Sequence, residues 1–114
     1  MTLKIKFKVM GKRWKLFLLT KKQYRKKIDE HSIAECHGDK HRIYLSPFGM
    51  DIKTLRHELV HAHLYELCLE SASGLTKDAM EEIFAELMAH RGPELLRLAN
   101  RLLSQVKELT EPKK

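Results

Sequence analysis

The hydrophobic pattern of this 114-residue chain changes its period near residue 50, and this change constrains the fold more than any other feature. Before it, short runs alternate apolar and polar residues, which is typical of strands with one buried face. After it, apolar residues recur every three or four positions, which is typical of helices packed along one side. Strands followed by helices predict the α+β class, with a small, mainly antiparallel sheet built from N-terminal hairpins.

Two hairpins are expected in the first half of the chain. The runs LKIKFKV and RWKLFLL are strand-like and flank a turn at Gly11, and two-residue turns that contain glycine are typical of hairpins. The segment SIAECHGDKHRIYLS has two β-type runs around a polar turn, which predicts a second hairpin.

The remaining segments predict helices. Thr20 can cap a short basic helix, KKQYRKKID, between the two hairpins. Three longer helices are expected at about residues 51–70, 77–90 and 93–109. The Gly92–Pro93 pair is expected to break the chain between the last two, because proline removes a helical hydrogen bond and clashes with the preceding turn.

Composition indicates one globular domain over residues 1–114, since 43% of the residues are hydrophobic and 32% are charged. No apolar run approaches the roughly 20 residues needed to cross a bilayer, so no membrane segment is expected. The N-terminal run alternates lysine with apolar residues, unlike a signal peptide. The expected location is therefore the cytoplasm.

Positive charge is concentrated near the N-terminus. Residues 1–28 contain eleven Lys or Arg and no acidic residue, whereas the rest of the chain contains eleven basic and fifteen acidic residues. This asymmetry predicts a polyanionic partner, nucleic acid first or else an acidic protein surface, and Trp14 could stack on a base. The alternative is an edge strand whose lysines keep one face in water, with Trp14 in the core.

The segment LRHELVHAHLYE contains the motif HExxH. On a helical wheel, His57 and His61 lie roughly 40° apart and Glu58 lies beside them. Two neutral imidazoles in this arrangement can bind one Zn²⁺ at about 2.0–2.1 Å each, and the glutamate can reach the water to be activated. His63 falls on a polar stripe with Arg56, so we do not expect it to bind the metal.

A catalytic zinc ion usually takes three protein ligands, so a third must come from elsewhere. Ala85 and Ala89 form a narrow small-residue stripe on the next helix, which we expect to approach the motif helix and bring a carboxylate to the metal. The spacing does not choose among the candidates on that helix, which are Glu81, Glu82, Glu86 and His90.

The motif "HELVH", followed about twenty residues later by "EEIFAE", resembles the gluzincin metallopeptidases. The compact size and the run HRIYLS before the motif are similar to minigluzincins and to the short ImmA/IrrE-type peptidases of phage and prophage. The resemblance covers roughly residues 34–91 and implies a zincin-like domain. It implies Glu82 as the third ligand and Glu86 as a carboxylate that orients a ligand histidine. Glu81 departs from the pattern, because asparagine often stands there.

A second segment, "AHRGPELLRLANRL", resembles part of the SprT-type proteases, which act on proteins crosslinked to DNA. That resemblance implies His90 as the third ligand instead. Arg91, inserted before the Gly-Pro pair, and a longer interval from His61 depart from it.

These features predict a zinc metallopeptidase that hydrolyses peptide bonds in a peptide or protein substrate. Glu58 would accept the proton of the attacking water and pass it to the leaving amine. Tyr65 or His90 could donate to the oxyanion. The strand RIYLS could bind an extended peptide by edge addition, or could only complete the sheet. The alternatives are a structural zinc module and a basic nucleic-acid-binding protein with an inactive zincin fold.

The last predicted helix has one strongly apolar side that must be covered. Packing against the glutamate-bearing helix and the surface beside the expected active-site cleft would cover this apolar side. The alternative is that the helix blocks the active-site cleft. The side consists of Leu95, Leu98, Leu102, Val106 and Leu109.

Overall fold

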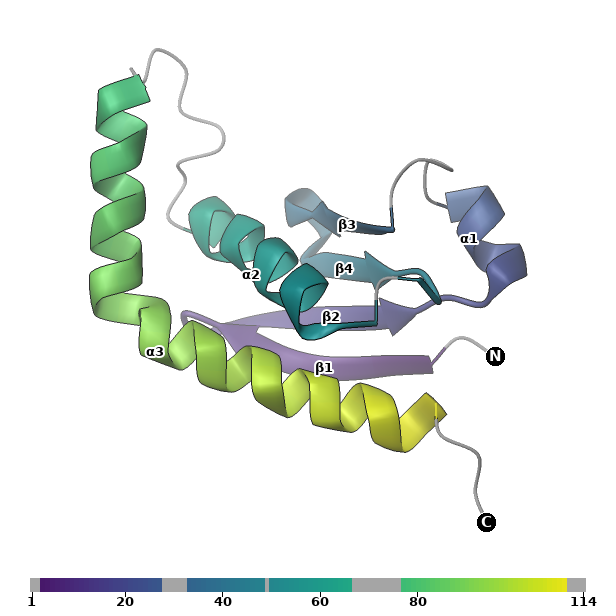
Figure 1. The fold of residues 1–114 in the computed structure, drawn as a ribbon. Coiled ribbons are helices and arrows are strands. Elements are labelled where there is room, and N and C mark those ends of the chain that lie inside the picture. The colour runs from purple at the N-terminus through teal and green to yellow at the C-terminus, as the bar shows by residue number, and fades with distance from the viewer. Residues whose placement is uncertain (1–2, 28–32, 49, 67–76, 111–114) are drawn as a thin grey trace.

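The computed structural model describes residues 3–27, 33–48, 50–66 and 77–110 and confirms the α+β class (Figure 1). Strands and helices follow in the predicted order, with a short 3-10 helix, η1, in the second hairpin. The predicted residues 28–29 and 67–70 of two helices lie outside the described residues. The elements are β1 (Leu3–Val9), β2 (Lys12–Leu18), α1 (Lys21–Lys27), β3 (Ala34–His37), η1 (Gly38–Lys40), β4 (Arg42–Leu45), α2 (Ile52–Glu66) and α3 (Lys77–Thr110).

The four strands form one sheet in the order β1-β2-β4-β3. Both predicted hairpins are present as antiparallel pairs, and β2 and β4 join them in parallel, with Lys15 opposite Arg42. The sheet is therefore mixed. Of the two predictions for RIYLS, completion of the sheet is confirmed and a peptide-binding edge is wrong, because β4 lies between β2 and β3 and the edge on that side is β3.

Local sequence explains where the hairpin turns and the helices begin. Met10 and Gly11 both have positive φ, 50° and 82°, as a tight two-residue turn requires. Thr20 caps α1 as predicted, since its Oγ1 accepts from the backbone N–H of Gln23 at 3.2 Å and the Gln23 side chain accepts from the Thr20 N–H at 3.0 Å. Asp51 caps α2 by accepting from the backbone N–H of Thr54 at 2.8 Å.

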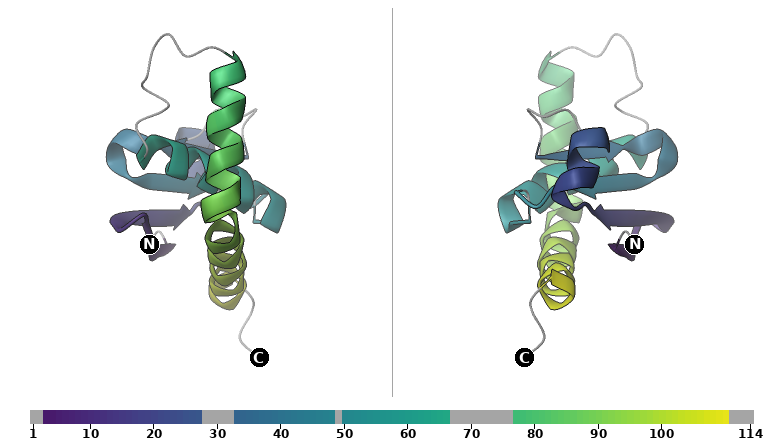
Figure 2. Two further views of the ribbon diagram at one scale, coloured as in Figure 1. Left: turned by 90° about the vertical axis from the view of Figure 1, so that its left-hand side faces the viewer. Right: turned by 90° about the vertical axis from the view of Figure 1, so that its right-hand side faces the viewer.

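Helices α2 and α3 lie on one face of the sheet, and α1 lies near one end of it (Figures 1 and 2). Apolar side chains from the inner strand faces and both helices form the main core, which explains the two periods of the sequence. The core residues are Ile5, Phe7, Val9, Trp14, Leu16, Leu18, Ile43, Leu45, Leu55, Leu59, Ala62, Leu95, Ala99, Leu102 and Val106.

The predicted break at Gly92–Pro93 is wrong, because α3 is continuous with Pro93 inside it. Figure 1 shows a sharp bend in α3 where its colour passes from green to yellow-green. Proline removes one helical hydrogen bond and clashes with the preceding turn. It can therefore bend a helix, rather than end it, when the residues that follow the proline are packed in the core. We call residues 77–91 the arm of α3.

The part of α3 that follows the bend belongs to the core. Leu95, Leu102 and Val106 are at most 1% exposed, whereas Leu109 is 45% exposed. The predicted packing of this apolar side is therefore confirmed for most of its residues. Of the two predicted covers, the glutamate-bearing helix is wrong, because the core around these residues is formed by the sheet and α2 and not by the arm.

We expect Leu102→Ala to lower the free energy of unfolding by about 2–5 kcal/mol, because it leaves a cavity between α3 and the sheet. Leu109→Ala on the same helix is the matched control and should change that free energy by less than about 0.5 kcal/mol. Urea unfolding followed by circular dichroism measures both. Equal losses in the two variants would contradict this placement of the core.

Candidate functional site

Helix α2 carries the HExxH side chains at the margin between its exposed and buried sides. The rings of His57 and His61 are neighbours, with centroids 5.0 Å apart and planes 68° apart. His57 is 68% exposed, whereas the Glu58 side chain is 8% exposed and its Oε1 lies 3.9 Å from Nε2 of His57. The two imidazoles are therefore neighbours, His57 exposed and His61 half-buried, beside a carboxylate at the buried margin of the helix.

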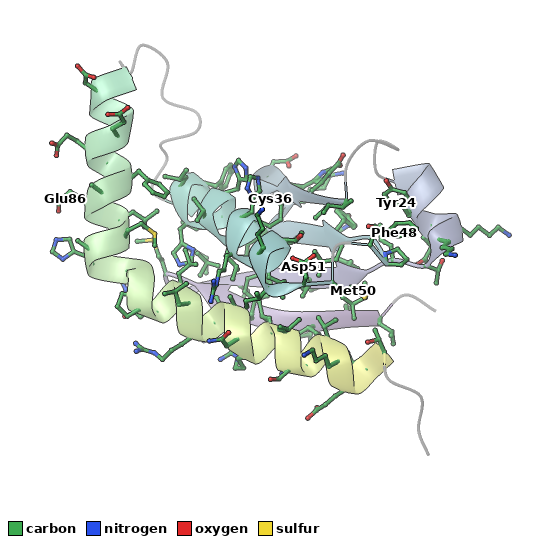
Figure 3. All side chains as sticks on the ribbon, viewed as in Figure 1. Tyr24, Cys36, Phe48, Met50, Asp51 and Glu86 are labelled. Atoms are coloured by element: carbon green, nitrogen blue, oxygen red, sulfur yellow. The ribbon has the colours of Figure 1, made fainter. Side chains whose placement is uncertain are left out.

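The structure places the third-ligand candidates on the arm of α3. Glu81, Glu82, Glu86 and His90 are all exposed. Glu86 lies on the side of the arm away from α2 (Figure 3), and its Oε2 is 3.0 Å from Nε2 of His90. Glu82 lines a small hollow of about 430 Å³ together with Met10 and His90.

These candidates do not join the histidine pair in the described part of the chain, where no three His, Cys, Asp or Glu side chains are grouped to hold a metal ion. The expected contact between the small-residue stripe and α2 is wrong, since Ala85 and Ala89 are exposed. The bend at Pro93 directs the arm away from the core (Figure 1). The histidine pair fits two of the three ligands of a catalytic zinc site.

His63 does not lie on a solvated polar stripe, contrary to the prediction. Its side chain is buried, 4% exposed, and Nδ1 donates to the backbone oxygen of Leu59 at 2.7 Å. Burial lowers the pKa of His63 from its ordinary value. Arg91 and Glu94 of α3 influence this pKa, because α3 covers this side of α2.

Glu66 links α2 to the sheet, a role that its position in the sequence does not indicate. Its Oε1 accepts from the indole Nε1–H of Trp14 at 2.8 Å and lies 2.9 Å from Nε2 of His41. Trp14 is only 1% exposed, which confirms the alternative that it lies in the core and excludes stacking on a base. This buried indole needed a partner for its N–H, and α2 supplies one.

Tyr65 lies against the second hairpin. Its ring centroid is 6.3 Å from that of Trp14 and 6.0 Å from that of His41. A Cβ atom at Gly38 would collide with the Tyr65 ring, so glycine permits this close approach. Oxyanion stabilisation by Tyr65 or His90 stays a prediction.

The opposite face of the sheet forms a second candidate surface. We call it the outer face, the side away from α2 and α3. Along β1 the lysines are exposed while Ile5, Phe7 and Val9 are buried, as predicted for an edge strand. In the register of the sheet, Lys6 lies opposite Lys15, and Lys15 lies opposite Arg42.

A hollow of about 1150 Å³ lies beside the β1–β2 hairpin and is strongly basic. Glu94 is the only carboxylate residue of this lining in the described chain, and it pairs with Arg91 at 3.1 Å. The hollow combines residues of the outer face with residues of η1 and α3. Its basic residues are Lys6, Lys8, Arg13, Lys15, Lys40, Arg42, Arg97 and Arg101.

Comparison of the chain with known protein families, curated proteins and solved structures finds no match. Among the described residues, no helix has the length and apolar character needed to cross a membrane.

Proposed function

We propose that the chain is a zinc-dependent metallopeptidase that hydrolyses peptide bonds in a peptide or protein substrate. The observation that carries this proposal is the HExxH geometry on α2. Two neighbouring imidazoles, with ring centroids 5.0 Å apart, one exposed (His57) and one half-buried (His61), lie beside a carboxylate that is 8% exposed. Neutral imidazoles at this spacing suit a zinc ion, and a glutamate beside them suits general base catalysis.

His57 and His61 would hold the metal, and we propose Glu82 as the third ligand. A zinc ion in such a site polarises a carbonyl group and lowers the pKa of water. Glu82 lies on the arm, apart from the histidine pair. Binding by all three residues would therefore require the arm to take another direction relative to α2, with Pro93 at the bend.

Glu58 would act as the general base of the reaction. Its carboxylate accepts a proton from the attacking water and passes it to the leaving amine. The side chain is largely buried, and its backbone is held in a helix whose core residues, Leu55 and Leu59, are fully buried. Burial of the side chain and anchoring of the helix would fix the orientation of the Glu58 carboxylate. Proton transfer over a short distance requires such a fixed orientation.

The edge strand β3 offers a place for the substrate. It packs beside α2 and pairs with β4 on one side, and no strand of the described chain pairs with its other side. An extended peptide could therefore add to this edge through main-chain hydrogen bonds, which give affinity with little sequence preference.

Metal removal tests the proposal. We expect the purified chain to hold about one zinc ion and to cleave an unfolded protein, to lose cleavage on dialysis against a chelator, and to regain it with added Zn²⁺. Metal analysis and gel electrophoresis of the products measure this. Cleavage that persists in the metal-free protein would contradict it.

The second candidate is a protein that acts at nucleic acid, either as an SprT-like protease on DNA-associated proteins or through binding alone with an inactive zincin fold. The observation that favours it is the basic hollow, which has eight Lys or Arg residues in its lining. Salt-dependent binding to nucleic acid would support this function and would leave the metallopeptidase test unaffected.

A further inference from the structure

We propose that the outer face of the sheet binds a single strand of nucleic acid, with its cations on the phosphates and with Arg42 and Phe17 beneath a base. This surface is separate from the histidine pair on α2, and the inference does not depend on peptidase activity. It specifies the polyanionic partner that the charge of the N-terminal region predicts.

The cross-strand pairing of like charges is the first reason. Lys6 lies opposite Lys15 and Lys8 lies opposite Arg13, and the row continues from Lys15 to Arg42. Neighbouring strands are about 4.7–4.9 Å apart, and like charges directly opposite each other destabilise a sheet. A bound polyanion would relieve this repulsion, whereas an edge strand needs only scattered charges to avoid aggregation.

The absence of internal neutralisation is the second reason. Within the described ranges, no carboxylate forms an ion pair with Lys6, Lys8 or Lys15. All three lysines line the basic hollow. Glu94, which also lines it, is paired with Arg91. The positive potential of this surface therefore remains available to a partner.

An ordered group of planar side chains is the third reason. The guanidinium carbon of Arg42 lies 5.2 Å from the ring centroid of Phe17, and the rings of Phe17 and Tyr44 stack with centroids 5.3 Å apart. The Tyr44 hydroxyl accepts from Nη1 of Arg42 at 3.3 Å. Tyr44 is buried and supports the ring of Phe17 from within, whereas Arg42 and Phe17 are half-buried. Guanidinium planes and aromatic rings both stack on unpaired bases, so Arg42 and Phe17 form a platform for a base next to the lysines.

A single strand fits this surface better than a duplex or an acidic protein. The bases of a duplex are stacked on one another and cannot use the Phe17–Arg42 platform, whereas those of a single strand can. An acidic protein surface would neutralise the charge of the lysines but would not stack on Phe17 and Arg42. The combination of cations and stacked planar groups therefore indicates a single strand with little sequence preference.

The test compares two double variants with the same change in charge. Lys6→Glu with Lys15→Glu alters the outer face, whereas Lys53→Glu with Lys107→Glu alters exposed positions on α2 and α3. Fluorescence anisotropy measures binding of a labelled oligothymidine of about 16 nucleotides, a site size typical of small single-strand-binding domains. Each protein is titrated at several salt concentrations.

We expect the outer-face double variant to bind on the order of tenfold more weakly than the wild type. The slope of log affinity against log salt concentration should become less steep by about 1.4, because two phosphate contacts are lost and each contributes about 0.7 for a single strand. The control double variant should stay within about twofold of the wild type. Lys6→Glu alone should weaken binding but raise the melting temperature, because it replaces a like-charge pair by an opposite-charge pair with Lys15. That combination separates lost binding from lost folding.

Three results would overturn the proposal: no binding by the wild type at low salt, equal weakening in both double variants, or a duplex of the same length that binds as tightly as the single strand. Competition by polyglutamate as effective as that by unlabelled oligothymidine would also overturn it, in favour of an acidic protein partner. Glu58→Gln should bind the oligonucleotide like the wild type.

Discussion

Glu58→Gln is expected to lower peptide hydrolysis by about 10²–10⁴-fold and to keep zinc near one ion per chain. The amide has nearly the shape of the carboxylate but cannot accept the proton of the attacking water. Zinc stays bound because the proposed ligands are His57, His61 and Glu82, not Glu58. Metal analysis and cleavage of an unfolded protein, both on the same preparation, measure the two effects separately.

Glu94→Gln is the matched control for this experiment. It removes one carboxylate from the exposed surface of α3, where Glu94 pairs with Arg91, and it should leave both zinc content and cleavage within about twofold of the wild type. Circular dichroism should show that both variants are folded. Full activity in a folded Glu58→Gln variant would reject the peptidase proposal.

The order of the elements could be predicted from the sequence because it depends on local signals. Alternation in LKIKFKV gives β1 its buried and exposed faces, and Thr20 and Gln23 cap α1 through a contact three residues apart. The parallel pairing of β2 with β4 could not be predicted, since it joins two hairpins through contacts between distant residues. That pairing also decides that β3 is an edge strand and β4 is not.

Predictions from local sequence patterns were wrong where packing between residues distant in the sequence determines the structure. The Gly92–Pro93 pair predicts a break, but buried residues on the far side, such as Leu95, hold the chain in a helix that bends. His63 looked polar on a wheel of α2 alone, yet α3 covers that side and buries it. The partner of Trp14 is Glu66, which lies fifty-two positions away.

The candidate site also has one part that could be predicted from the sequence and one part that could not. The neighbouring positions of His57 and His61 follow from helical geometry, because both residues belong to one helix. The position of Glu82 depends instead on the direction of the arm, which the bend at Pro93 sets. Residue spacing carries no information on the size or direction of such a bend, so the distance from Glu82 to the histidine pair could not be predicted from the sequence.

Substitutions on the arm should identify the third ligand. We expect Glu82→Ala to weaken zinc affinity by more than about 100-fold, comparable with His57→Ala and His61→Ala, because each removes a donor atom from the metal. Glu86→Ala should cost about 10–100-fold, the usual effect of losing a group that orients a ligand. Glu81→Ala is the matched control on the same exposed turn and should have little effect. Competition with a fluorescent zinc chelator measures all five affinities.

The outcome of this series also decides whether the arm moves. Glu82 is not grouped with the histidine pair in the described part of the chain, so strong zinc loss in Glu82→Ala would mean that the arm changes direction when zinc binds. His90→Ala should leave the affinity within about tenfold, since His90 already contacts Glu86 at 3.0 Å. Release of zinc by His90→Ala but not by Glu82→Ala would mean that His90 is the third ligand, as the SprT resemblance implies, and not Glu82, as the gluzincin resemblance implies. Unchanged affinity in all four arm variants would reject both sets, because the arm would then supply no ligand.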